Sequence, residues 1–214
     1  MTRARVALVD YGAGNLRSVA KALERSGLEV ELAADAAVVE RADGVVLPGA
    51  GAFADGMAGL RRNGLDEALL KALELRRPYL GLCLGVQLLF ELGEEHGLTD
   101  GLGVVKGRVQ RFADVDSRGS RRRVPHIGWN EVQFSGEHPM LEHLPERDFF
   151  YFVHSYRPVP ADERIVVGRT HYGDEFASVI AQDSIFAVQF HPEKSQHAGL
   201  RLLNAYCSWV ESSR

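Results

Sequence analysis

Short apolar runs alternate with longer stretches of helical periodicity in the first half of the chain. The runs predict strands at residues 6–10, 29–32, 44–47 and 79–82. Helical character is predicted for residues 15–26, 65–75 and 86–92. Strands that alternate with helices form parallel sheets covered by helices on both faces, and uninterrupted apolar runs fit strands that are buried on both sides.

After Gly101 the pattern changes to one strand-like run after another. These runs lie at residues 104–112, 130–134, 149–154, 165–170, 177–181 and 185–190. Glycine, proline and aspartate between them indicate hairpins, and residues 196–211 return to helical spacing. No repeat or linker interrupts the chain. We therefore predict one α/β domain over residues 1–214, with a central mixed, mostly parallel sheet flanked by helices on both faces and an antiparallel portion in the second half.

Composition and charge are those of an ordinary globular protein. Of the 214 residues, 45% are hydrophobic and 25% are charged, and the net charge of −4 provides no general electrostatic reason to bind nucleic acid. No apolar run is long enough to span a bilayer, and the first residues lack the core of a signal peptide. We therefore expect a cytoplasmic protein.

The chain contains two cysteines in different surroundings. Cys207 lies among apolar residues at helical spacing, which predicts a buried small hydrophobe that stays unpaired in a reducing compartment. No group of His, Cys, Asp and Glu has the spacing of a zinc site. Gly12 and Gly14 follow the first strand, but the third glycine of a dinucleotide fingerprint is replaced by Arg17. We expect neither a metal nor a cofactor.

Cys83 lies between a predicted strand and a predicted helix, with Gly81 and Gly85 two residues away on either side. A nucleophile between two such glycines at a strand-to-helix junction is held exposed on a sharp turn. The start of the helix offers free N–H groups and a positive field, both of which favour a thiolate. By itself this elbow also fits a peptidase or a general thiol hydrolase.

A cysteine nucleophile needs a base, and the base needs an orienting partner. His191 follows the last predicted strand, at an edge where active sites of open α/β sheets form. Pro192 favours an extended backbone at His191, so His191 and Glu193 can project to the same side. A structural hydrogen-bonding role is the alternative for His191, because His-Pro also occurs in ordinary turns.

The segment Pro48-Gly49-Ala50-Gly51 follows a buried strand and emerges at the same edge as the Cys83 elbow. The backbone N–H groups of Gly49 and Ala50 can join that of Leu84 to form an oxyanion hole. A plain glycine turn remains the alternative.

Two other segments each allow two structural roles. Arg121-Arg122-Arg123, with Arg118 nearby, has no aromatic residues between its charges, which favours a solvated loop over a phosphate or partner contact. His126 and Trp129 stand just outside the predicted strand at residues 130–134, either in a buried turn or as an interface anchor.

Together, the Pro48 loop, the Cys83 elbow and His191-Pro192-Glu193 resemble the class I glutamine amidotransferases over nearly the whole chain. The resemblance implies an α/β sheet that carries the nucleophile on an elbow. It also implies that Cys83 attacks the side-chain amide of glutamine to form a γ-glutamyl thioester. His191, held by Glu193, then protonates the leaving ammonia and activates water.

The same resemblance assigns glutamine binding to five positions. These are Gly51, Gln87, Glu95, Ser155 and Tyr156. A carboxylate at Glu95 suits the α-ammonium group of glutamine, and Gln87 lies one helical turn after the nucleophile.

Four segments resemble one branch of the family, the glutaminase subunits that serve imidazole glycerol phosphate synthesis in histidine biosynthesis. They are residues 10–15, 125–130, 154–156 and 191–195. That branch implies a heterodimer in which ammonia passes to a (β/α)8-barrel cyclase subunit, with Asn15, Trp129 and Lys194 at positions of the interface and its signalling. Ala50 stands where the family often has valine, and Ile127 where methionine is usual.

Two alternatives to this function are open. A glutaminase that serves another synthase, such as a chorismate-using enzyme, has the same elbow and the same His-Pro-Glu segment. A regulatory subunit can keep the fold after losing the chemistry, but Cys83, His191 and Glu193 are all present here.

Overall fold

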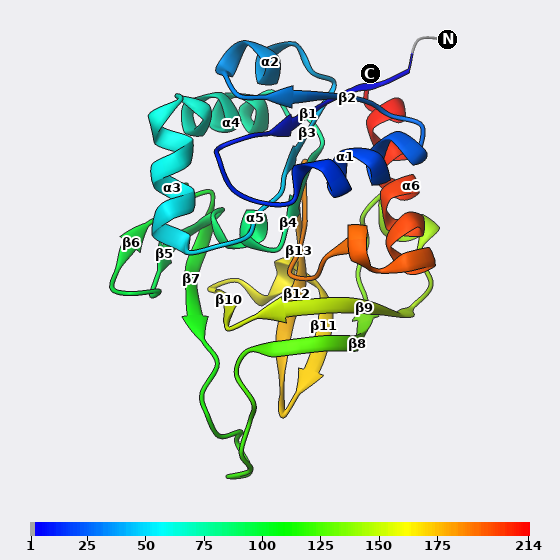
Figure 1. The fold of residues 1–214 in the computed structure, drawn as a ribbon. Coiled ribbons are helices and arrows are strands. Elements are labelled where there is room, and N and C mark those ends of the chain that lie inside the picture. Colours follow the sequence, from blue (N-terminus) through cyan, green and yellow to red (C-terminus); the bar gives the residue numbers. More distant parts are fainter. Residues whose placement is uncertain (1–2) are drawn as a thin grey trace.

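A nine-stranded sheet runs through the computed structural model, which describes residues 3–214 (Figure 1). In spatial order its strands are β2 (Glu29–Ala33), β1 (Arg5–Val9), β3 (Gly44–Leu47), β4 (Tyr79–Leu82), β13 (Ile185–Val188), β12 (Asp174–Gln182), β11 (Val166–Tyr172), β8 (His126–Phe134) and β9 (Arg147–His154). Pairing is parallel from β2 to β13 and antiparallel from β13 to β9. The predicted α/β fold with a mixed sheet is therefore confirmed.

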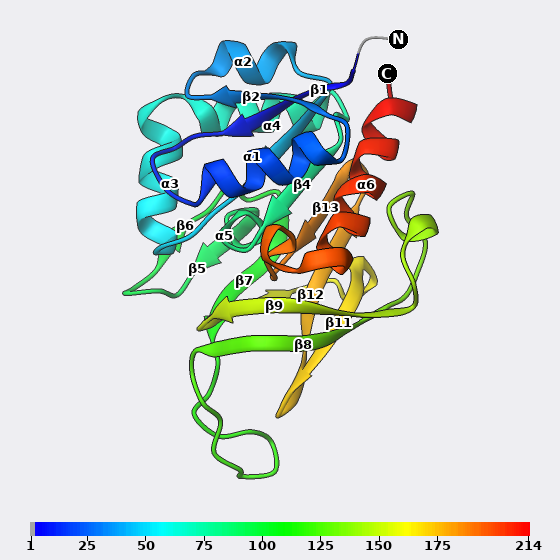
Figure 2. The ribbon, with the colours of Figure 1, turned by 45° about the vertical axis from the view of Figure 1, so that its right-hand side comes forward.

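Helices cover both faces of the parallel half, as Figure 2 shows. One layer consists of α1 (Leu16–Arg25) and α6 (Gln196–Ser212), and the other of α2 (Ala36–Arg41), α3 (Phe53–Arg62) and α4 (Leu65–Glu74). Successive side chains of a strand point to opposite faces. Leu8 of β1 accordingly packs in the core of the first layer and Val9 in the core of the second. Cys207 of α6 is buried, as predicted.

The second sheet is small and was not predicted. Its order is β10 (Tyr156–Pro160), β7 (Val105–Arg111), β5 (Phe90–Gly93) and β6 (Thr99–Asp100). The predicted helix over residues 86–92 is wrong from residue 88 onward, because helix α5 spans only Leu84–Gln87. The carbonyls of Leu88 and Phe90 accept hydrogen bonds from the N–H groups of Leu102 and Gly103. These non-local partners override the helical preference of the segment.

Other differences from the prediction have local causes. Strand β8 begins at His126, so His126 and Trp129 lie within it rather than before it. Helices α2 and α3 have no predicted counterpart. Helix α3 contains two glycines, which lower its helix propensity, and at one of them, Gly59, a Cβ would lie 2.4 Å from the carbonyl oxygen of Tyr11. That close approach of two backbones explains the glycine.

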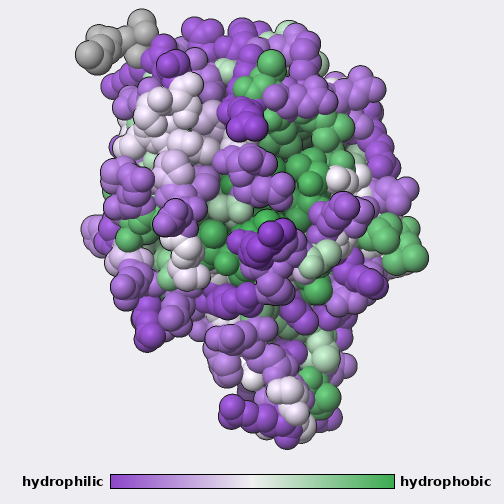
Figure 3. Space-filling model, turned by 180° about the vertical axis from the view of Figure 1, so that it is seen from behind, coloured by the Kyte–Doolittle hydropathy of each residue, from purple (hydrophilic) through white to green (hydrophobic). Residues whose placement is uncertain are grey.

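The loop between β7 and β8 contains the basic run and projects from the body of the molecule at the lower end of Figure 3. The side chain of Arg122 is only 6% exposed, so the predicted solvated loop is wrong at this position. Its Nη2 donates to Asp174 Oδ2 at 2.6 Å, and the guanidinium lies 5.3 Å from the centre of the Phe112 ring. Arg122 thereby fastens the loop to the β11–β12 hairpin.

Short 3-10 helices complete the fold at Leu141–His143 (η1), Glu163–Ile165 (η2) and Pro192–Lys194 (η3). Within residues 3–214, no helix combines the length and the apolar character needed to cross a membrane. The ends of β3, β4 and β13 lie side by side at one edge of the sheet, and the chain segments that leave this edge form the candidate site.

Candidate active site

The turn from β4 to α5 holds Cys83 in a strained backbone conformation, with φ 53° and ψ −104°. A non-glycine residue in a sparsely populated region of this kind costs about 1–3 kcal/mol. The turn is tight on both sides. A Cβ at Gly85 would lie 1.9 Å from the carbonyl oxygen of Leu47, and one at Gly81 would lie 2.9 Å from Ala187 Cβ. The predicted elbow is present, and the two glycines are required for it.

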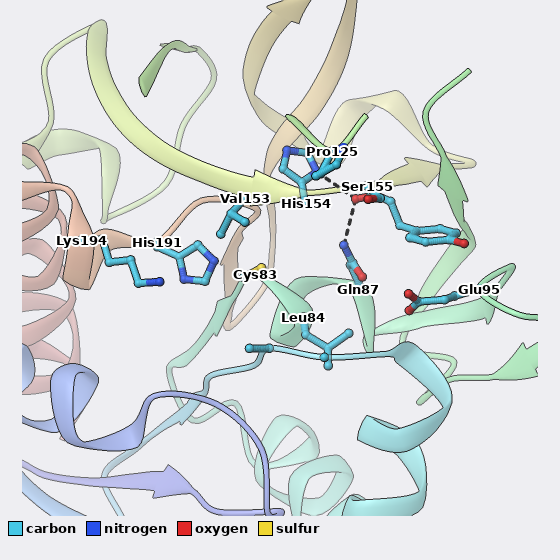
Figure 4. A pocket seen from close by; sticks show the side chains of 13 residues that line it. Cys83, Leu84, Gln87, Glu95, Pro125, Val153, His154, Ser155, His191 and Lys194 are labelled. Atoms are coloured by element: carbon cyan, nitrogen blue, oxygen red, sulfur yellow. Dashed lines mark hydrogen bonds between the residues drawn. The ribbon is translucent and has the colours of Figure 1, made fainter. Parts of the chain in front are cut away.

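His191 leaves the end of β13 and is held in place by backbone and side-chain contacts. Its N–H donates to the carbonyl of Tyr151 at 2.9 Å, and its Nδ1–H donates to Glu193 Oε1 at 2.9 Å. The two side chains are 8% and 4% exposed. The other ring nitrogen, Nε2, is buried without a hydrogen-bond partner among the described residues. Figure 4 shows the ring directed toward Cys83, so the predicted pairing of His191 with Glu193 leaves Nε2 for chemistry at the sulfur.

The electrostatics of His191 follow from these neighbours. Burial would lower the pKa of the imidazole, but Cys83 and Glu193 outweigh burial and raise the pKa to about 10. The ring is therefore protonated at neutral pH. A cation beside the sulfur favours the thiolate, which is the nucleophilic form of cysteine.

Most of the predicted site residues line one cavity of about 370 Å³, a size typical of small-ligand sites. The cavity is lined by Ala50, Gly51, Cys83, Leu84, Gln87, Glu95, Pro125, Val153, His154, Ser155, Tyr156, His191 and Lys194. Gly49, Glu193 and Asn15 instead line a neighbouring cavity of about 40 Å³ behind the Pro48 loop, together with Ala50 and His191. Trp129 lies outside both.

The Pro48 loop rests directly on the elbow. A Cβ at Gly49 would lie 2.4 Å from Leu84 Cβ and 2.6 Å from the hydroxyl oxygen of Tyr11. That hydroxyl is buried and donates to the carbonyl oxygen of Pro48 at 3.0 Å. The structure thus brings the three predicted oxyanion-hole residues together, and it adds Tyr11 as an anchor of the loop.

Cys83 lies between His191 on one side and Gln87 on the other, with Glu95 at the far end of the cavity (Figure 4). Glu95 Oε2 accepts the N–H of Phe53 at 2.7 Å, at the start of α3. This contact replaces the side-chain cap that the preceding Ala52 cannot provide. A carboxylate fixed at the end of the cavity distant from Cys83 suits the α-ammonium group of an amino acid whose side-chain amide reaches the sulfur.

The three predicted interface residues lie near the cavity in different ways. Asn15 caps α1 by accepting the N–H of Ser18 at 3.4 Å. Trp129 is 48% exposed, and its ring meets Tyr151 edge-on at 6.2 Å. Lys194 Nζ lies 5.9 Å from the centre of the same Tyr151 ring. Sequence reasoning missed Tyr151, which connects Trp129 with Lys194 because it pairs with Trp129 across β8 and β9.

Three buried polar residues near the cavity were also missed or left undecided. Gln189, His126 and His154 are buried, and most of the buried residues around them are apolar. Burial lowers the pKa of His126 to about 4, and burial together with the charges of His126 and His191 lowers that of His154 to about 3. His126 Nδ1 lies 3.0 Å from His154 Nε2. His126 is therefore part of the interior rather than an interface anchor.

Comparison with known proteins relates the whole chain to one family. The model of the family described as glutamine amidotransferase class-I matches residues 7–205. The chain is 50% identical over 210 residues to imidazole glycerol phosphate synthase subunit HisH of Aromatoleum aromaticum, covering 96% of this chain and 98% of the relative. It is 49% identical over 203 residues to the subunit of the same name from Aquifex aeolicus, covering 94% and 95%.

Solved structures show the same fold at lower identity. A crystal structure described as a glutamine amidotransferase superposes with a TM-score of 0.73 at 21% identity, covering 96% of this chain and 98% of that one. PurLQS from Thermotoga maritima superposes with a TM-score of 0.74 at 19% identity, covering 98% of this chain and all of that one.

The Glu193→Gln substitution should lower the pKa of His191, because it removes a carboxylate that raises it. The imidazole would then lose its proton at a lower pH than in the wild type. An NMR titration of isotope-labelled histidine measures this directly. Glu95→Gln, which removes a carboxylate at the far end of the same cavity, is the matched control. An unchanged titration of His191 in Glu193→Gln would contradict the assigned role of the carboxylate.

Acid should destabilise the protein through its buried neutral histidines. The ordinary pKa of histidine is 6.5, so below that pH His126 and His154 bind protons in the unfolded chain. In the folded protein their lowered pKa values keep them neutral. Stability therefore falls as the pH drops from about 6.5 toward 4, by at most about 1.4 kcal/mol per pH unit for each histidine. His191 contributes little to this fall below pH 6.5, because its raised pKa keeps it protonated in the folded state and its ordinary pKa protonates it in the unfolded chain. Above pH 6.5 its stabilising contribution decreases as the pH rises, and it does so equally in the wild type and in His126→Gln.

Urea unfolding at pH 7 and pH 5 tests this effect. His126→Gln should reduce the difference in stability between the two pH values without abolishing it, because His154 remains, as does His138, whose pKa burial also lowers. The exposed His197 of α6 offers the control substitution His197→Gln. Equal pH dependence in His126→Gln and the wild type would exclude a neutral His126.

Proposed function

The chain belongs to the class I glutamine amidotransferase family, and we propose that it hydrolyses glutamine and passes the ammonia to a cyclase subunit in imidazole glycerol phosphate synthesis, a step of histidine biosynthesis. The observation that carries this proposal is a strained elbow cysteine on one cavity with a histidine whose Nδ1 is held by a buried carboxylate. The relatives that share about half of the sequence over almost the full chain support the choice of pathway.

In the proposed reaction, the thiolate of Cys83 attacks the side-chain carbonyl carbon of glutamine. The negative oxygen that forms is stabilised by backbone N–H groups of Leu84 and of the loop at Gly49 and Ala50. The protonated Nε2 of His191 donates its proton to the leaving nitrogen, and the C–N bond breaks to give ammonia and a thioester.

Deacylation uses the same groups in reverse. The now neutral His191 takes a proton from water, the hydroxide attacks the thioester, and the C–S bond breaks to return the thiolate and glutamate. Glu193 keeps the imidazole oriented throughout through the bond at Nδ1. Glutamine and water are thereby converted into glutamate and ammonia.

The other proposed contacts place the amino-acid end of glutamine. Glu95 binds the α-ammonium group through Oε1, because its Oε2 accepts the N–H of Phe53 at the start of α3. Gln87, Ser155 and Tyr156 line the cavity between Glu95 and Cys83, and Gly51 contributes backbone from the loop opposite them. The same substrate thus spans the cavity from Glu95 to the elbow.

An exposed apolar row on β8 and β9 is the proposed seat of the cyclase subunit. In the register of the two strands, Ile127 pairs with Val153, Trp129 with Tyr151 and Glu131 with Phe149. These side chains share one face of the ladder, because positions two apart point the same way. Ile127, Trp129 and Phe149 are about half exposed, while Val153 lines the cavity. The row therefore leads from the surface to the site, where a partner receives ammonia.

This arrangement supports a heterodimer in which Trp129, Asn15 and Lys194 act at the interface with a (β/α)8-barrel partner. We also propose that residues 1–214 form one amidotransferase domain, because a single sheet joins β1 near the start with β13 near the end. A cytoplasmic location suits a site that depends on a free thiol, and both cysteines are unpaired.

Cys83→Ala should abolish glutamine-dependent synthesis by the reconstituted pair and leave synthesis from added ammonia intact. The reason is that only the supply of ammonia passes through the sulfur. Product formation is measured with glutamine and with an ammonium salt in parallel. Cys207→Ala, at the other buried cysteine, is the control and should retain both activities. Glutamine-dependent turnover by Cys83→Ala would show that the nucleophile is misassigned.

Trp129→Ala should weaken binding to the cyclase subunit by about ten-fold or more, as expected for loss of an aromatic interface anchor. Titration calorimetry with the purified subunit measures the change. Leu32→Ser is the matched control, since Leu32 is as exposed as Trp129 but lies on β2 at the opposite edge of the sheet. Weaker binding of Leu32→Ser alone would move the interface to that edge.

A further inference from the structure

Gln189 is an unusual residue for its position. It follows β13 between Val188 and Phe190, which both belong to one apolar core, and its own exposure is 0%. Burying an amide costs free energy unless its donors and acceptors find partners, and an apolar residue avoids that cost. The contacts of this amide therefore need an explanation that packing does not provide.

Gln189 touches the sulfur of Cys83. Its Nε2 lies 3.7 Å from Cys83 Sγ, and an amide nitrogen can only donate. The backbone enforces this proximity, because Leu82 pairs with Val188 and the N–H of Cys83 donates to the carbonyl of Val188 at 2.8 Å. The sulfur is the acceptor of this bond, as a thiolate is.

The amide of Gln189 is held in the orientation that presents Nε2 rather than Oε1 to the sulfur. Gln87 Nε2 donates to Gln189 Oε1 at 3.0 Å. Gln87 cannot rotate its amide to reverse this bond, because its Nε2 also donates to the carbonyl oxygen of Tyr156 at 3.0 Å, and a carbonyl only accepts. Figure 4 shows this second bond from Gln87 beside the one from His154.

Two neutral histidines complete the chain of hydrogen bonds. His154 Nδ1 donates to the same Tyr156 oxygen at 2.9 Å, so His154 Nε2 is an acceptor and accepts a hydrogen bond from His126 Nδ1–H at 3.0 Å. His126 Nε2 then accepts from Asn130 Nδ2 at 3.2 Å. The second N–H of Asn130 is used by the carbonyl of His171 at 2.9 Å. The histidine branch and Gln87 therefore both donate to the Tyr156 carbonyl oxygen, and every donor and acceptor in the network is assigned without conflict.

We propose that Gln189 is a further catalytic residue, which donates an N–H hydrogen bond to the sulfur of Cys83 and stabilises its negative charge. The proposal rests on the proposed function. The donor is present in every step, whether His191 is protonated or neutral, and it therefore supports the thiolate both as nucleophile and as leaving group. Gln87, whose own amide is oriented by the Tyr156 carbonyl, acts as the positioning residue that keeps the Gln189 amide in this orientation.

Two substitutions separate the donor from the space that Gln189 fills. Gln189→Glu keeps the size of the side chain and an oxygen for Gln87, but it places an oxygen instead of an N–H against the sulfur. Gln189→Met keeps most of the volume without a donor or a charge. Thr170→Val is the control, because Thr170 is buried on β11 and bonds to Ser178 rather than to the site.

Alkylation of Cys83 by iodoacetamide is measured in each protein over a range of pH, with kcat and KM for glutamine in the complex with the cyclase subunit. At neutral pH, Cys83 in Gln189→Glu should be alkylated at about one tenth of the wild-type rate or more slowly still, which is the loss expected for one hydrogen bond to a charged acceptor. Gln189→Met should show a smaller loss. The difference in alkylation rate between the variants and the wild type should narrow as the pH rises, because the thiolate then forms without the donor. In the glutaminase assay, the variants should show a larger fall in kcat than change in KM.

His191 and Tyr11 are the titratable groups that interact with the charge of Cys83, and both are kept in all of these proteins. Gln189→Glu adds one carboxyl group beside the sulfur, and Gln189→Met, which adds none, separates the loss of the donor from the effect of that charge. Wild-type affinity for the cyclase subunit, measured by titration calorimetry, together with a wild-type urea midpoint, shows that the variants fold. Wild-type alkylation and kcat in both Gln189 variants would overturn the proposal, and so would a deficit that is equal at every pH. Iodoacetamide needs no glutamine turnover, so loss of the proposed function itself would leave the alkylation result interpretable.

Discussion

The parallel register of β3, β4 and β13 is the constraint on which the site depends. Leu47 lies opposite Gly81, and Leu82 lies opposite Val188, so three segments distant in sequence leave the sheet side by side. They are the Pro48 loop, the Cys83 elbow and the turn with His191. The approach is so close that a side chain at Gly85 would meet the carbonyl of Leu47. Placement of the candidate catalytic groups is therefore a property of the sheet and not of flexible loops.

The site concentrates features that are individually unfavourable. The backbone of Cys83 is strained, Glu193 is buried as a carboxylate, and its Oε2 has no hydrogen-bond partner among the described residues. A buried charge is tolerable only when it is paired, and here the protonated His191 stands between Glu193 and the sulfur. Glu193 and Cys83 each attract the imidazolium and raise the pKa of His191, and the two apolar cores on either side of the sheet hold the three groups in place.

Local chemistry explains which parts of the fold and site could be predicted. The Cys83 elbow follows from glycine spacing, and the pairing of His191 with Glu193 follows from Pro192 and a separation of two residues. Features that depend on distant partners could not be read from the sequence. Residues 90–93 form a strand because their neighbours come from elsewhere in the chain, and Arg122 is buried because Asp174 and Phe112 meet it. Gln189 stands in an apolar run, and only its contact with Cys83 distinguishes it.

Because side chains alternate between the two faces of a strand, β8 and β9 contribute both to the proposed partner surface and to the site. The outward side chains Trp129 and Tyr151 form the proposed partner surface, whereas the inward His126 and His154 support the Tyr156 carbonyl at the cavity wall. Both faces of this ladder also reach the cavity, since the outward Val153 and the inward His154 line it. Since Tyr151 also accepts the N–H of His191 on its carbonyl, a partner seated on this ladder contacts the strand that positions the base. The proposed interface and the proposed chemistry therefore share a single piece of rigid backbone.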